Sequence, residues 1–255
     1  MAYRPLPYHQ YFIDNSEDRN HLGTARRKVH YRAVTYACHG LPGIFGLKHE
    51  MNYEIFYEED RNVIQLNFQK TTGWTDWFAN VAEFSSRYYD SIDFCGEKLQ
   101  LRVHHGWAEM YKSIKYEVRE QWKAIHDAHP DAVTEVVGWS LGSAQAILCT
   151  QDLNYNFGVR PYLYTFGSVK PFRYTSKNRD RTLAYLRGTY SVCYNFAIRN
   201  DLVTYMPPFR GYTMLHRVEL AREKRTLKKL LNPGFYHTIY DRENLYREAE
   251  RETRV

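Results

Sequence analysis

Residues 136–148, VVGWSLGSAQAIL, place one serine between two glycines, in the order Gly138, Ser140 and Gly142. In a G-x-S-x-G turn between a strand and a helix, the serine backbone is strained and its hydroxyl points outward. Neighbouring backbone crowds such a turn, so the positions two residues before and after the serine need to lack bulk, as glycine does. The pattern therefore predicts a nucleophile elbow with Ser140 as the attacking group.

The residues on either side of this turn favour the catalytic interpretation over an ordinary glycine-bounded turn. Residues 134–137 are typical of a short buried strand. Ser143, Ala144 and Ala146 are small, so the helix that follows can lie close to the sheet. The N-terminus of that helix places positive partial charge near the serine.

A serine hydroxyl is a weak nucleophile. It needs a histidine base, and the histidine needs an acid that fixes its tautomer. In hydrolases with a strand-to-helix elbow, the order along the chain is serine, acid, histidine. Asp201 comes directly after a strand predicted at residues 191–198, and His216 and His237 follow it. The order selects Asp201 as the acid and leaves both histidines as candidates for the base.

The elements that position these groups alternate between strands and helices, without repeats or a clear domain boundary. Such alternation predicts an α/β fold in one domain, with a mostly parallel central sheet flanked by helices on both faces. Reacting groups in such sheets lie at the carboxyl ends of strands, which is where the serine falls. The predicted elements include a hairpin over residues 53–69 with its turn at 59–62, and helical periodicity from about Arg26. Helices are predicted over 75–90, 106–128 and 218–232, a strand followed by a turn within 99–107, and further strands at 162–167 and 191–198.

The composition is that of a globular protein, with 255 residues of which 44% are hydrophobic. A net charge of +6 would suit an anionic surface such as phospholipid, but acidic and basic residues are interspersed, which favours a general role in solubility. The charged residues 218–232 are similarly open to two interpretations. They predict a solvated surface helix, or a basic amphipathic helix that rests on anionic lipid.

The sequence gives weaker indications of compartment and partners. The cysteines Cys38, Cys95, Cys149 and Cys193 are far apart, so we expect free thiols in a reducing compartment. The N-terminus has no apolar signal region, and no apolar stretch is long enough to span a bilayer. We therefore expect a cytoplasmic or virus-encoded protein, soluble or peripheral to a membrane. No nucleic-acid motif and no set of ligands at metal spacing occurs around His104 and His105, so we expect neither partner.

Five segments in order resemble the class 3 lipases, the fungal-type lipases and their relatives. Each segment is weak on its own, and their joint order is specific. The segments are VIQLNFQKTTGWTDWFANV (63–81), RVHHGW (102–107), VVGWSLGSAQAIL (136–148), YTFGSVKPF (164–172) and RNDLVTYMPP (199–208). The chain departs from the family pattern at Gln69-Lys70, where the family has Arg-Gly, and at Trp139, where it has histidine.

The resemblance implies an α/β-hydrolase fold over residues 26–255, preceded by an N-terminal arm over 1–25 that we expect to be extended or loosely packed. The resemblance also implies that no cofactor or metal is required. It implies that the backbone N–H groups of Leu141 and Thr71 form the oxyanion hole. The segment FYHTIY matches the family's catalytic histidine, which makes His237 the base and His216 noncatalytic. The segment after the oxyanion loop resembles a lid that opens at a lipid surface, with the apolar candidates Trp74, Trp77, Phe78, Val81 and Phe84.

Together these observations predict a serine hydrolase that acts on lipid or simpler carboxylic esters through Ser140, Asp201 and His237. Two alternatives stay open. One is a catalytically idle hydrolase fold that binds lipid or a protein. The other is an acyltransferase or thioesterase that uses the same three residues. The sequence determines neither the ester nor the oligomeric state.

Overall fold

The computed structural model describes residues 3–15, 27–38, 47–68, 86–88, 102–177, 179–208, 210–221 and 234–253. A seven-stranded sheet forms its centre, with the strands in the order β1-β2-β3-β6-β7-β9-β11. These strands are β1 (Arg27–Cys38), β2 (Leu47–Glu58), β3 (Val63–Phe68), β6 (Val133–Trp139), β7 (Tyr162–Phe166), β9 (Val192–Ala197) and β11 (Arg217–Glu219). The helices are α1 (Tyr8–Asn15), α4 (His105–Lys112), α5 (Lys115–Ala128), α6 (Leu141–Phe157), α7 (Arg179–Gly188), α9 (Phe235–Thr238) and α10 (Arg247–Thr253), with 3-10 turns η2 (Leu202–Tyr205) and η3 (Glu243–Leu245).

The central sheet is mostly parallel, as predicted. β3, β6, β7, β9 and β11 run parallel to one another, whereas β1 and β2 are antiparallel additions at one edge. The predicted hairpin is present as β2 and β3, joined by the turn at 59–62. A second, four-stranded antiparallel sheet, which the sequence did not predict, contains β10 (Tyr212–Thr213), β8 (Phe172–Arg173), β5 (Arg102–His104) and β4 (Ser86–Tyr88).

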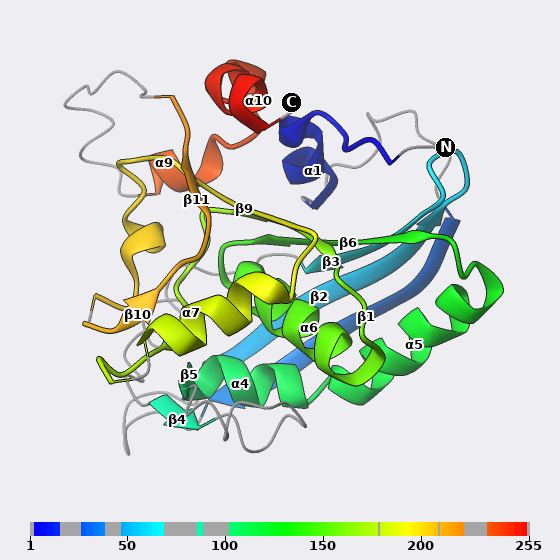
Figure 1. Cartoon of the computed structure of the whole chain (residues 1–255), viewed down its shortest axis with the longest axis horizontal. Helices are drawn as coiled ribbons and strands as arrows, with labels where there is room; N and C mark the ends of the chain where they lie inside the picture. The colour runs from blue at the N-terminus through cyan, green and yellow to red at the C-terminus, as the bar shows by residue number, and fades with distance from the viewer. Residues whose placement is uncertain are drawn as a thin grey trace.

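Helices cover both faces of the central sheet (Figure 1), because successive strand residues point to opposite sides. On one face, α4, α5, α6 and α7 pack against residues such as Val136 and Leu163. On the other face, α1, α9 and α10 pack against residues such as Val137 and Tyr164. Two hydrophobic cores therefore sandwich the sheet. Among the described residues, no helix combines the length and apolar character needed to span a bilayer.

Four sequence predictions of secondary structure are wrong in part. The stretch predicted as a helix over 218–232 begins in the strand β11, which pairs with β9, and residues 222–232 lie outside the described part. The helix predicted over 106–128 is two helices, α4 and α5, since Ser113 donates its hydroxyl to the carbonyl of Met110 at 2.7 Å and competes with the helical hydrogen bonds. The helical periodicity expected from Arg26 is a strand, β1, which is rich in the β-branched and aromatic residues that strands favour. The helix predicted over 75–90 contains the strand β4 at Ser86–Tyr88, and its other residues lie outside the described part.

The expectation of an extended or loosely packed N-terminal arm is also wrong for residues 3–12. Tyr8, Tyr11 and Phe12 in α1 are each at most 4% exposed and belong to one of the two cores. Tyrosine made this segment look polar in sequence, although its ring supplies apolar area and only its hydroxyl needs a polar partner. The boundary predicted near residue 25 lies outside the described residues.

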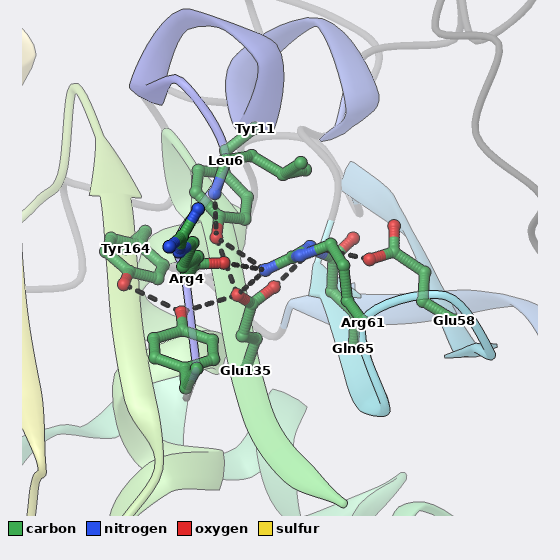
Figure 2. A network of polar contacts seen from close by, with 9 residues as sticks. Arg4, Leu6, Tyr11, Glu58, Arg61, Gln65, Glu135 and Tyr164 are labelled. Atoms are coloured by element: carbon green, nitrogen blue, oxygen red, sulfur yellow. Dashed lines mark hydrogen bonds and ion pairs between the residues drawn. The ribbon is translucent and has the colours of Figure 1, made fainter. Parts of the chain in front are cut away.

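A buried carboxylate on β6 holds the N-terminal segment against the sheet (Figure 2). Glu135 is 0% exposed and accepts hydrogen bonds from the hydroxyls of Tyr3 at 2.5 Å and Tyr11 at 2.6 Å. The guanidinium of Arg61 forms an ion pair with the same carboxylate oxygen, and Gln65 donates to the other oxygen at 2.8 Å. We call these five residues the Glu135 cluster. It lies at the amino end of β6, away from the elbow.

Candidate active site

Ser140 has the strained backbone expected of an elbow. Its φ of 57° and ψ of −125° are unusual for a residue with a side chain, and it lies between the end of β6 and the start of α6. A Cβ atom on Gly138 would come within 2.6 Å of the Cα of Ser143 and 2.7 Å of the Cβ of Ala146. This crowding explains why the strand can end here only with glycine two residues before the serine.

Asp201 follows β9 and starts the short 3-10 turn η2. Its Oδ1 accepts the backbone N–H of Val203 at 3.0 Å, while its Oδ2 lies 2.9 Å from Nδ1 of His237 in α9. Both side chains are buried, with Asp201 0% and His237 5% exposed. A carboxylate at Nδ1 favours the tautomer with the proton on that nitrogen, so that Nε2 is the ring atom able to accept a proton.

Gly167 and Trp139 connect the serine to this acid–histidine pair. The N–H of Ser140 donates to the carbonyl of Phe166 at 3.0 Å, and the next residue, Gly167, has a φ of 56°. A Cβ on Gly167 would lie 2.8 Å from Nδ1 of His237, so only glycine leaves room for the imidazole. The ring of Trp139 lies 5.9 Å from that imidazole between centroids. The structure therefore brings Ser140, Asp201 and His237 to one edge of the sheet.

Tyr240 is a residue of this site that the sequence analysis missed. Its hydroxyl donates to Oδ2 of Asp201 at 2.7 Å and accepts the backbone N–H of Ile198 at 3.1 Å. Burial, and after it the charge of Asp201, raises the pKa of Tyr240 well above its ordinary value, so the hydroxyl stays protonated and donates. The signal was present in FYHTIY, where the aromatic residue three positions after His237 helped to locate the histidine and received no role.

The remaining sequence candidates divide into those that the structure describes and those that it does not. His216 is exposed, and its carbonyl accepts the N–H of Asn195; the histidine that contacts Asp201 is His237. Leu141 is the first residue of α6, directly after the serine, and is buried. The other oxyanion candidate, Thr71, and the lid candidates lie outside the described residues; the lid candidates are Trp74, Trp77, Phe78, Val81 and Phe84.

Other groups that could do chemistry have structural environments. His104 is buried, and its ring stacks on Trp107 at 4.0 Å between centroids. Within the described ranges, no cluster of three or more histidine, cysteine or acidic side chains could hold a metal ion. Cys149 and Cys193 are free and buried, and burial raises the pKa of Cys193 to about 12 and that of Cys149 further. Both sulfurs are therefore thiols at neutral pH and poor nucleophiles.

The sheet order, the elbow and the acid–histidine pair at the carboxyl ends of the strands define an α/β-hydrolase fold. The chain belongs to the class 3 lipase family, whose sequence model, described as "Lipase (class 3)", matches residues 66–211. The resemblance stated from the sequence is confirmed. None of the curated proteins matches the chain in a sequence comparison.

Solved structures of fungal lipases share this fold. Lipase II from Rhizopus niveus is 20% identical, with a TM-score of 0.58 over 76% of this chain and 66% of that chain. A Rhizomucor miehei lipase in complex with its propeptide is 18% identical, with a TM-score of 0.59 over 84% of this chain and 66% of that chain. A triacylglycerol lipase described as having a serine protease triad at its catalytic centre is 17% identical, with a TM-score of 0.62 over 92% and 90%. The chain thus spans 66% of the length of the Rhizopus and Rhizomucor proteins.

Proposed function

We propose that this protein is a serine hydrolase that cleaves the carboxylic ester bonds of lipids, with Ser140, Asp201 and His237 as its catalytic triad. The observation that carries the proposal is the 2.9 Å contact between Nδ1 of His237 and Asp201, at the edge of the sheet where the strained Ser140 lies. Membership of the class 3 lipase family supports the reaction type and the class of substrate.

In the proposed reaction, Oγ of Ser140 attacks the ester carbonyl while Nε2 of His237 takes its proton. Asp201 stabilises the imidazolium that forms, and two further donors, Tyr240 and the N–H of Val203, hold its carboxylate in place. The backbone N–H of Leu141 stabilises the oxyanion, together with that of Thr71. The imidazolium then protonates the leaving alcohol, and a water molecule activated by His237 hydrolyses the acyl-serine.

The proposed substrate class is a lipid ester at an interface, either an acylglycerol or a phospholipid. A similar fungal lipase–inhibitor complex, 19% identical with a TM-score of 0.56, is described as a model for interfacial activation in lipases. The same triad would serve an acyltransferase or a thioesterase, so the acceptor of the acyl group is the point that substrate assays need to decide.

A fluorophosphonate probe, which labels activated serines, tests the proposal directly. We expect the wild-type protein to be labelled, and Ser140→Ala to lose both labelling and ester hydrolysis while it keeps its fold. Ser191→Ala is the matched control, because Ser191 is exposed and donates its hydroxyl to the carbonyl of Arg160. An unlabelled wild-type protein that hydrolyses no ester would overturn the proposal and favour a catalytically idle hydrolase fold.

A further inference from the structure

Phe12, in the N-terminal helix α1, lies between two aromatic residues of the candidate active site. Its ring meets that of Trp139 edge to face, with 4.6 Å between centroids, and lies 5.7 Å from the ring of Tyr240. Phe12 is 4% exposed, so its side chain is part of the packed interior.

The two rings that Phe12 contacts both flank the histidine. The centroid of the His237 ring is 5.9 Å from that of Trp139 and 6.5 Å from that of Tyr240. Tyr240 also donates to the carboxylate of Asp201. Phe12 therefore packs behind two groups that set the position of the imidazole, although it lies 225 residues before the histidine by subtraction of the sequence numbers.

We propose that Phe12 is a positioning residue for His237 and acts through Trp139 and Tyr240. The proposal rests on the proposed function, since it assigns a role within the same reaction. Residue 12 lies outside the part of the chain that matches the family model, which begins at residue 66. The N-terminal segment thus contributes to a site whose family motifs all come later in the chain.

Two polar contacts of α1 explain how a single ring can hold this position. Tyr11 donates to Glu135 on β6, and the backbone N–H of Tyr8 donates to Glu250 in α10 at 3.4 Å. Glu135 and Trp139 lie on the same face of β6, because alternate strand residues share a face. The Glu135 cluster therefore fixes α1 along the strand that ends at the elbow, with Phe12 beside Trp139.

Close packing makes the imidazole sensitive to Phe12. A smaller side chain would leave a space behind Trp139 and Tyr240, and packed interiors fill such a space only by shifting their neighbours. A displacement of a catalytic group by about 1 Å can cost about 10²-fold in rate. An effect on the position of the imidazole alone should fall on kcat and leave KM nearly unchanged.

The test compares Phe12→Leu with Tyr8→Leu in the full chain, each assayed well below its unfolding temperature. Tyr8 is a matched control, since it is a buried aromatic residue of the same helix whose ring contacts Phe196 and Tyr246 instead of Trp139. We expect both variants to unfold at lower temperature. Only Phe12→Leu should lower kcat, by about tenfold, and the rate of fluorophosphonate labelling should fall with it.

A double-mutant cycle separates positioning from general packing. If Phe12 acts through Trp139, Phe12→Leu should change kcat little once Trp139→Leu is present, whereas Tyr8→Leu and Trp139→Leu should be additive. A wild-type kcat in Phe12→Leu, or additive effects of the Phe12 and Trp139 substitutions, would overturn the proposal. If the wild-type protein shows no hydrolysis dependent on Ser140, the proposed function itself has failed, and this outcome is distinct from a failure of Phe12 alone.

Discussion

Two buried carboxylates, Asp201 and Glu135, lie at opposite ends of the central sheet in similar surroundings. Each is 0% exposed, and each accepts hydrogen bonds from tyrosine and from a basic side chain. Asp201 receives Tyr240 and His237 on one oxygen. Glu135 receives Tyr3, Tyr11 and Arg61 on one oxygen. Figure 2 labels Tyr11 and Arg61 beside Glu135.

The basic partner and the backbone around each carboxylate distinguish the two regions. Burial lowers the pKa of the Arg61 guanidinium, but Glu135, Tyr11 and Glu58 together outweigh burial and raise that pKa above its ordinary value. This ion pair therefore never exchanges its proton near neutral pH. Glu135 lies within a strand that is paired on both sides. Asp201 lies in a turn after a strand, and its partner is an imidazole, which can take up and release a proton. The same ingredients therefore make a structural clamp at one end and a candidate catalytic pair at the other.

The largest expected effect comes from replacing each carboxylate side chain by the corresponding amide. Asp201→Asn should lower kcat for ester hydrolysis by about 10⁴-fold, because an amide in this position favours the wrong tautomer of the histidine. Glu135→Gln should leave kcat within a few-fold of wild type when the protein is assayed folded.

The stability of the fold should be more sensitive to Glu135→Gln than kcat is. Glu135→Gln removes one of the two carboxylates paired with Arg61 and leaves Glu58 as the other. It should lower the free energy of unfolding by about 1.5–3 kcal/mol, measured by urea denaturation. A folded Glu135→Gln protein without activity would show that the two regions are not functionally distinct.

The local part of the site could be predicted from the sequence, whereas its long-range part could not. The elbow is specified within five residues, since the crowded backbone beside Ser140 requires glycine at position 138. The choice between His216 and His237 depends on how residues 202–240 return to the sheet, which spacing alone left open. Asp201 contacts His237, but the catalytic role of each residue stays a prediction.

The parts of the fold that were missed have physical reasons as well. The strand β5 was predicted, but its partners in the second sheet, β4, β8 and β10, have two or three residues each, which is too short for an alternating pattern to emerge. The segment over residues 3–12 was predicted to be a loose arm because its buried residues are mainly tyrosines, and tyrosine is common on surfaces as well. Its partners, such as Glu135, are more than 100 residues away in sequence.

An intermediate effect should come from removing one tyrosine hydroxyl from each carboxylate. Tyr240→Phe removes a donor to Asp201, and since hydrogen bonds to charged groups contribute about 1.5–3 kcal/mol, we expect kcat to fall about tenfold. Tyr11→Phe removes the equivalent donor to Glu135 and should lower kcat by less, because Tyr11 acts on His237 only indirectly, through the position of α1 and Phe12. Steady-state kinetics at saturating ester measures both. An equal loss of kcat in the two variants would contradict the separation of the regions.

The smallest expected effect is a loss of stability at alkaline pH. In this respect the two regions should behave alike. Burial first, and then the neighbouring carboxylate, raises the pKa of Tyr11 and of Tyr240 well above the ordinary value of 10.0. A phenol with a raised pKa in the folded state contributes stability that is complete below pH 10, and this stability is lost as the pH rises above 10, because only the unfolded chain ionises there. Between pH 8 and 10.5, each such tyrosine should lower the free energy of unfolding by about 0.8 kcal/mol.

Tyr11→Phe and Tyr240→Phe should therefore each reduce this alkaline loss of stability by that amount, measured by urea titrations at the two pH values. Tyr116→Phe is the control and should not reduce the loss, because the Tyr116 side chain is 65% exposed. A reduction in one variant alone would mean that only one of the two phenols stays buried and protonated in the folded protein.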